Sequence, residues 1–140
     1  KISEQIKDLL IPRNYNVDIL SHLGQAYELI KKKKYGVVIL DINFEECFNF
    51  INMIKKEIND SLPFILLSDV SGSHEIVRAS YNNGAAECLR KPIYAEEFIL
   101  RVEQHSNTSK LIYELLEQKE IMKNYKIIVD QSSIISKTNI

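Results

Sequence analysis

The sequence contains little cysteine, no long apolar run and no excess of either charge. Its two cysteines, Cys47 and Cys88, lie far apart, and neither belongs to a CxxC or Cys/His pattern. A disulfide framework and the usual zinc motifs are therefore not indicated, and a reduced cytosolic protein is the simplest interpretation. No apolar run approaches the ~18 residues that a membrane span requires, and no signal peptide is visible.

Charge and composition narrow the class of protein further. The net charge is −1, so the sequence gives no basis for a nucleic-acid surface. The four lysines at 31–34 are best interpreted as the solvated C-terminal end of a helix, where cations are favourable. The 140 residues, 45% of them hydrophobic, allow one globular domain with a useful core and a little extra. The dispersed histidines predict no metal or catalytic site; they are His22, His74 and His105.

Helical and strand patterns alternate along the chain. Apolar residues at helical spacing predict helices over residues 2–10, 24–34, 46–58, 73–84 and 95–102, the last continuing through 110–125. A strand pattern occurs at 16–20, 36–40, 63–67 and 86–92. This alternation predicts an α/β domain with a parallel sheet, helices on both faces and right-handed crossovers.

A polar side chain that could take part in a reaction follows each of the last three predicted strands. Asp41 ends one apolar run, Ser68 ends the next, and Lys91 ends the last. Ligands of such sheets bind outside the carboxyl ends of the strands, where these groups would meet. A carboxylate, a hydroxyl and an ammonium group suit phosphoryl transfer, with Asp41 as nucleophile and Mg²⁺ supplying further positive charge. Taken singly, each residue is more often an ordinary cap, turn or loop residue, and only the three together favour phosphoryl transfer.

The motifs "VVILDIN", "PFILLSD", "NNGAAECLRKP" and "EEFILRV" together resemble the response-regulator receiver domain of two-component signalling. The resemblance covers about residues 1–105. Asp41 and Ser68 are 27 residues apart, and Ser68 and Lys91 are 23 apart, as in the family. The resemblance implies a flavodoxin-like (βα)5 three-layer sandwich and an extended C-terminal helix.

The resemblance also implies a role for each site residue. Asp41 matches the phosphoacceptor, Ser68 the phosphate-binding hydroxyl and Lys91 the family's lysine. Asn43 matches the position whose backbone carbonyl binds Mg²⁺ beside Asp41, and Pro92 matches a proline preceded by a cis peptide. The implied partners are a histidine kinase or histidine phosphotransfer protein, which donates the phosphoryl group, and an attached output domain.

The family's first strand and its pair of acidic Mg²⁺ ligands are expected upstream of Lys1. The chain opens on Lys1 inside a periodic pattern, so we expect it to be part of a longer protein. Without the first strand, the strands at 16–20 and 36–40 would face a gap in the sheet. Residues 125–133, "YKIIVDQSS", resemble such a strand and are one substitute, donated by a neighbouring chain.

Beyond the receiver region, residues 106–125 are expected to form a linker helix and 126–140 to begin a following domain that resembles a PAS domain. A dimer through the linker is an alternative, with a loose heptad seam of Ile112, Leu115, Met122 and Val129. Lys119 and Lys126 interrupt that seam.

Two other functions compete with a phosphorylated receiver. Cys88 occupies the switch position where the family carries Tyr or Phe, which favours a pseudo-receiver that acts as a protein-interaction module. The alternative is a small α/β phosphatase with an aspartyl intermediate. That class carries a second acid where this chain has Asn43, and no Gly-rich phosphate loop is present.

Overall fold

The computed structural model of the chain describes residues 2–41, 44–69 and 74–139, with 44–45 and 120–139 described by their backbone only. The elements follow the order α1 (Ile2–Leu10), η1 (Ile11–Arg13), α2 (Leu23–Lys32), β1 (Val38–Asp41), α3 (Phe44–Glu57), β2 (Phe64–Ser68), α4 (His74–Asn82), β3 (Glu87–Arg90) and α5 (Ala95–Asn139). Contacts divide the chain into two units, Lys1–Ser109 and Lys110–Ile140.

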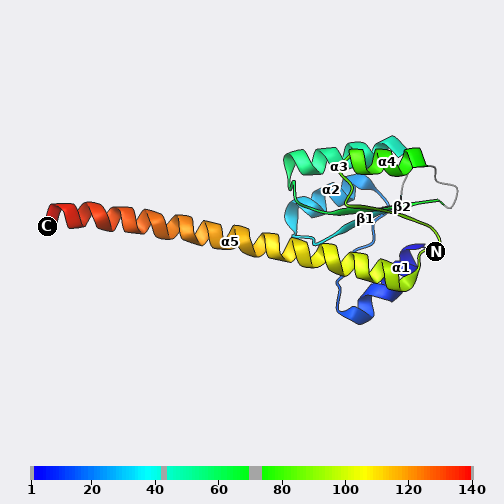
Figure 1. Cartoon of the computed structure of the whole chain (residues 1–140), viewed down its shortest axis with the longest axis horizontal. Coiled ribbons are helices and arrows are strands. Elements are labelled where there is room, and N and C mark those ends of the chain that lie inside the picture. The colour runs from blue at the N-terminus through cyan, green and yellow to red at the C-terminus, as the bar shows by residue number, and fades with distance from the viewer. Residues whose placement is uncertain (1, 42–43, 70–73, 140) are drawn as a thin grey trace. The chain divides into compact units, whose positions relative to one another are not determined.

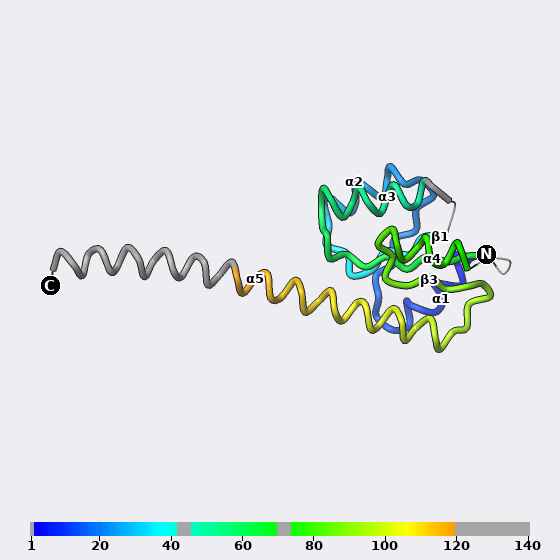
Figure 2. The backbone as a smooth tube through the Cα atoms, turned by 45° about the horizontal axis from the view of Figure 1, so that its top comes forward, coloured from blue at the N-terminus to red at the C-terminus, as the bar shows by residue number. Residues whose placement is uncertain are grey.

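The sheet is parallel, has the strand order β1-β2-β3, and buries β2 completely (Figure 1). Alternate side chains of β2 enter two cores, as the period of two in a strand requires. Phe64 and Leu66 pack with the apolar faces of α2 and α3, whereas Ile65 and Leu67 pack with α1 and the beginning of α5. Figure 2 shows α2 and α3 side by side. The predicted α/β domain with helices on both faces is confirmed.

The prediction of a strand over residues 16–20 is wrong. That segment has no regular secondary structure, and β1 pairs with β2 alone within the described part of the chain. A cavity of about 580 Å³ lies between residues 15–23 and residues 35–41, beside the free edge of β1. A strand forms only where a neighbour offers backbone partners, and the cavity separates this segment from β1.

The segment at 16–20 is held instead by a side-chain contact. The Tyr35 hydroxyl donates a hydrogen bond of 2.6 Å to Asp18 Oδ2. Burial, followed by this hydrogen bond and the charge of Asp18, raises the pKa of Tyr35 from 10.0 to about 12.

This raised pKa predicts a stability change at high pH. Between pH 10 and about 12 the unfolded state loses the Tyr35 proton while the folded state keeps it, so the stabilisation present below pH 10 is lost as pH rises. Urea unfolding across this range should show a decline that is shallower in Tyr35→Phe. An identical slope in both proteins would contradict the assignment.

Gly84 lies just after the end of α4 and has a φ of +95°. Residues with a Cβ adopt this left-handed backbone conformation only at a cost in free energy. A Cβ at this position would also lie 3.0 Å from Lys55 Cε. We therefore expect Gly84→Ala to lower the free energy of unfolding by about 1–2 kcal/mol.

Gly24 offers the matched control for Gly84. It lies in α2, and a Cβ there meets no atom within 4 Å. Gly24→Ala should raise the free energy of unfolding by about 0.5–1 kcal/mol. Denaturant titration of both variants measures the change in the free energy of unfolding, which should be negative for Gly84→Ala and positive for Gly24→Ala. Equal changes would contradict the assignment of the Gly84 effect to its left-handed backbone conformation.

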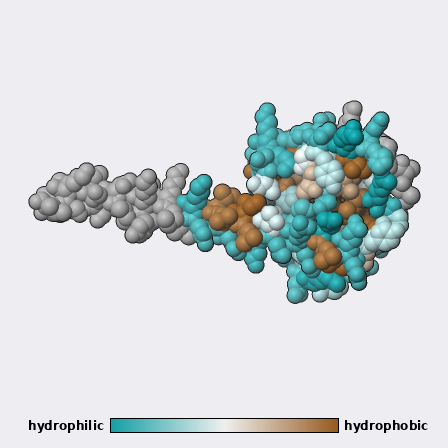
Figure 3. Space-filling model, in the orientation of Figure 1, coloured by the Kyte–Doolittle hydropathy of each residue, from teal (hydrophilic) through white to brown (hydrophobic). Residues whose placement is uncertain are grey.

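The long helix α5 confirms the predicted C-terminal extension, and it runs through the residues predicted to start a following domain. Residues 125–133, which resemble a strand in sequence, are helical within α5. A helix satisfies its own backbone groups, whereas a strand at this place requires a partner. A group of apolar side chains lies on the described surface of the second unit (Figure 3). No helix within the described residues has the length and apolar character to span a membrane.

Candidate functional site

Two of the three predicted site residues are in direct contact at the carboxyl edge of the sheet. Asp41 is the last residue of β1, and Lys91 follows β3 directly. Lys91 Nζ lies 2.7 Å from Asp41 Oδ1. The Lys91 backbone N–H donates to the Ser68 carbonyl at 2.9 Å, which fixes the lysine beside β2. The Lys91–Pro92 peptide bond is cis, as the resemblance implies for Pro92.

Exposure differs between the members of this contact. The Asp41 side chain is 50% exposed and the Lys91 side chain 24% exposed. The Asp41 carboxylate is therefore open to a reactant from solvent while it is held against a cation.

Ser68 ends β2 between the other two residues, and its side chain is 2% exposed. Its hydroxyl has no hydrogen-bond partner among the described residues. A buried hydroxyl without a partner costs about 1–3 kcal/mol, so such groups are rare and frequently belong to functional sites. The Ser68 hydroxyl is thus a buried donor without a partner at this edge.

Two further contacts at this edge were not predicted from the sequence. Asp69 Oδ1 lies 3.8 Å from Lys91 Nζ, and the Cys47 thiol donates to the Asp41 carbonyl at 3.6 Å. The position of Asp69, directly after a strand end, is the signal that could have identified it.

The Mg²⁺ ligands predicted from the resemblance are only partly visible. Asn43 lies outside the described residues. Within the described part of the chain, no three acidic, histidine or cysteine side chains converge as a metal site. The described carboxylates at this edge, those of Asp41 and Asp69, both approach Lys91. Two carboxylates suit an ion such as Mg²⁺, which takes most of its other ligands from phosphoryl oxygens and water.

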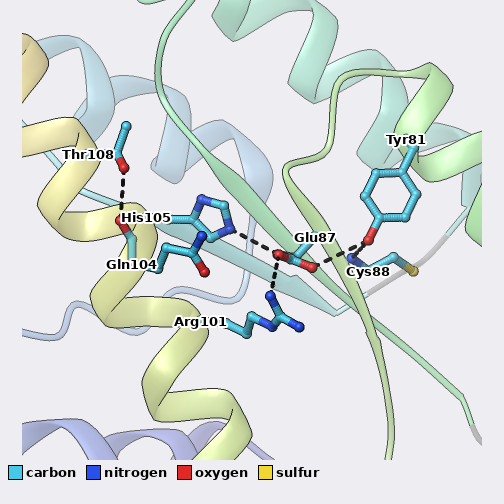
Figure 4. Close-up of polar contacts among 7 residues, drawn as sticks. All are labelled: Tyr81, Glu87, Cys88, Arg101, Gln104, His105 and Thr108. Carbon is cyan, nitrogen blue, oxygen red and sulfur yellow. Dashed lines mark hydrogen bonds and ion pairs between the residues drawn. The ribbon is translucent and has the colours of Figure 1, made fainter.

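A second polar cluster centres on the Glu87 carboxylate, next to Cys88 in β3 (Figure 4). The Cys88 N–H donates to the Tyr81 hydroxyl, which donates to Glu87 Oε2; both distances are 3.3 Å. Glu87 Oε1 lies 3.4 Å from Arg101 Nη1 and 3.3 Å from His105 Nε2. Burial is the main cause that raises the pKa of Tyr81.

This cluster joins α4, β3 and α5 and places the Tyr81 hydroxyl of α4 at the Cys88 backbone N–H. The sequence did not predict it, although Arg101 and His105 share a helix face at i, i+4 spacing. His105 therefore has a structural partner in Glu87.

Comparison with known proteins adds independent findings. The family model of the response regulator receiver domain matches residues 1–103. A transcriptional regulatory protein, CrdR of Helicobacter pylori, is 27% identical over 109 residues, which are 76% of this chain and 50% of that protein. The chain spans between half and two-thirds of the length of the curated relatives it matches.

Solved structures agree with the family match. NtrX from Brucella abortus in complex with ADP has a TM-score of 0.71 and 25% identity, over 83% of this chain and 26% of that one. The beryllofluoride-activated NtrC4 receiver domain dimer has a TM-score of 0.69 and 25% identity, over 77% of this chain and 89% of that one. The comparisons give no support to the PAS resemblance of residues 126–140.

Proposed function

Because the chain belongs to the response regulator receiver domain family, we propose that Asp41 is its phosphoacceptor. A histidine kinase or histidine phosphotransfer protein donates the group, and the phosphorylated receiver controls an attached output domain in the cytoplasm. The domain is a signalling module rather than a metabolic enzyme.

The observation that carries this proposal is the contact of Asp41 with Lys91 beside the unpartnered Ser68 hydroxyl. A carboxylate oxygen of Asp41 attacks phosphorus, the N–P bond of the donor phosphohistidine breaks, and the imidazole leaves. The product is an acyl phosphate. Lys91 balances charge on the phosphoryl oxygens, and the Ser68 hydroxyl donates a hydrogen bond to one of them.

Receiver domains use Mg²⁺ for phosphorylation, and Asp41 with the Asn43 carbonyl would hold the ion here. When bound, Mg²⁺ supplies positive charge to the phosphoryl group. Asp41 is the one sequence-predicted ligand among the described residues, so the ion would take its other ligands from phosphoryl oxygens, water and residues outside the described part.

The phosphorylated state would differ from the free state at Ser68. A hydrogen bond from Ser68 to the phosphoryl group exists only after phosphorylation, so it shifts the population of conformations. The Tyr81–Glu87 cluster lies on β3, the strand that pairs with the Ser68 strand β2. We propose that the shift reaches α4 and α5 through this cluster. The cluster would take the role of the aromatic residue that the family carries at the position of Cys88.

A pseudo-receiver is the second candidate, favoured by the absence of a three-residue acidic cluster within the described residues. Such a domain would bind partners through its surface without phosphorylation. Cys88 at the switch position is consistent with it. The intact contact between Asp41 and Lys91 favours the phosphorylated receiver.

Acetyl phosphate distinguishes the two candidates. Incubation of the chain with acetyl phosphate and Mg²⁺ should add the mass of one phosphoryl group, as measured by intact-protein mass spectrometry. Asp41→Asn should abolish the increment, whereas Asp60→Asn, a control at an exposed aspartate after α3, should retain it. No increment in the unsubstituted chain, under conditions that label an ordinary receiver, would favour the pseudo-receiver.

A further inference from the structure

A second carboxylate lies close to the cation of the phosphoacceptor site. Asp69 comes directly after β2, and its Oδ1 atom lies 3.8 Å from Lys91 Nζ. The same ammonium group lies 2.7 Å from Asp41 Oδ1. Lys91 is therefore shared between two carboxylates, and the proposed transfer uses only that of Asp41.

The backbone brings Asp69 to this place. Ser68 of β2 is paired in register with Arg90 of β3, so Asp69 and Lys91 are the next residues along these two adjacent strands. The Lys91 N–H donates to the Ser68 carbonyl at 2.9 Å, which joins the two segments where the strands end. The proximity of Asp69 to Lys91 thus follows from the sheet, although the Asp69 side chain is 81% exposed.

The charges of these side chains do not balance. One ammonium group faces two carboxylates, so the three groups sum to one negative charge when all are ionised. A phosphoryl donor is itself an anion, and its oxygens must approach Lys91 during the transfer. The Asp69 carboxylate repels them there, and because Asp69 is exposed, solvent and salt weaken this repulsion without removing it.

We propose that Asp69 is a specificity-determining residue of the phosphoacceptor site, which disfavours small, highly charged phosphoryl donors. Asp69 makes no bond to the phosphoryl group. Its carboxylate acts through its charge and by competing with the phosphoryl oxygens for Lys91. The inference rests on the proposed function, because it requires transfer of the phosphoryl group to Asp41.

Two small donors of different charge test this selectivity. Acetyl phosphate is a dianion at neutral pH, and phosphoramidate is a monoanion. Asp41 attacks phosphorus in each, and acetate leaves as its O–P bond breaks or ammonia leaves as its N–P bond breaks. For each donor, the labelling rate of Asp69→Asn is divided by that of the unsubstituted chain. This ratio removes the difference between leaving groups and reports the charge of the donor.

The expected ratios follow from Coulomb's law. At low ionic strength Asp69→Asn should speed labelling by acetyl phosphate about tenfold, because the substitution removes a unit charge that repels a dianion. The gain with phosphoramidate should be about threefold, since the repulsion energy is proportional to the charge of the donor. In about 0.5 M salt both gains should largely disappear, because ions screen an exposed carboxylate. Intact-protein mass spectrometry at saturating Mg²⁺ measures the rates.

Two further variants separate charge from structure. Asp69→Glu keeps the charge and should label at the rate of the unsubstituted chain. Asp60→Asn removes the same charge from an exposed aspartate after α3 and should leave both rates unchanged. Exposed ion pairs contribute little to stability, so Asp69→Asn should unfold at the same urea concentration as the unsubstituted chain.

The outcomes separate this inference from the proposed function. Labelling of Asp41 that is equally fast or slower in Asp69→Asn would overturn the inference and leave the phosphoacceptor role of Asp41 standing. An equal gain with both donors, or a gain that persists in high salt, would also overturn it, because neither follows the charge of the donor. Absence of labelling by both donors in the unsubstituted chain would overturn the proposed function, and the inference with it.

Discussion

Replacing Lys91 with methionine should slow the labelling of Asp41 by acetyl phosphate by about a hundredfold or more. The Lys91 ammonium lies 2.7 Å from the carboxylate, so it meets the phosphoryl oxygens as they arrive. Methionine keeps most of the side-chain volume and removes the charge. Time-resolved intact-mass spectrometry in the presence of Mg²⁺ measures the rate.

The same substitution should hardly change the stability of the fold. Asp41 is half exposed, and ion pairs with an exposed partner contribute about 0–1 kcal/mol. Lys91→Met therefore separates the chemical role of Lys91 from a structural one. Lys31→Met, in the exposed lysine run, is the control and should label normally. An unchanged rate in Lys91→Met would show that this cation takes no part in the transfer.

Replacing Phe64 with alanine should lower the free energy of unfolding by about 3–5 kcal/mol. Phe64 is fully buried in β2 and packs edge-on against Phe50, with ring centroids 6.2 Å apart. Alanine would leave a cavity in the centre of the sheet, where β1 and β3 pair with β2 on either side. A loss of this size is a large part of the stability of a small domain, about 5–15 kcal/mol.

Urea unfolding followed by circular dichroism measures this loss. Met53→Ala is the control, because Met53 is exposed on α3 and should change the free energy by no more than about 0.5 kcal/mol. A cost below about 1 kcal/mol for Phe64→Ala would mean that the core does not centre on β2.

The strands and helices could be predicted from the sequence wherever their formation does not depend on pairing with another segment. The continuous apolar run at 63–67 indicated a strand buried on both faces, and β2 confirms it. The alternation of Val17 and Ile19 also indicated a strand, but a strand needs a partner on the sheet edge. The sequence pattern describes the faces of a segment and contains no information about whether its backbone is paired.

The position of the site could be predicted for a similar reason. Parallel strands bring their carboxyl ends to one edge, so Asp41, Ser68 and Lys91 follow from the strand ends alone, and the structure joins Asp41 to Lys91. The Tyr81–Glu87 cluster could not be predicted, because it depends on how α4 and α5 pack beside β3. The catalytic roles of Asp41, Ser68 and Lys91 and the switching role of the Tyr81–Glu87 cluster are proposals.

The most direct test of the account locates the phosphoryl group on the chain. After treatment with acetyl phosphate and Mg²⁺, borohydride reduction converts an aspartyl phosphate to homoserine, which peptide mass spectrometry assigns to one residue. We predict homoserine at position 41 in the unsubstituted chain and at no other aspartate. Modification at another aspartate, or none at position 41, would contradict Asp41 as the phosphoacceptor.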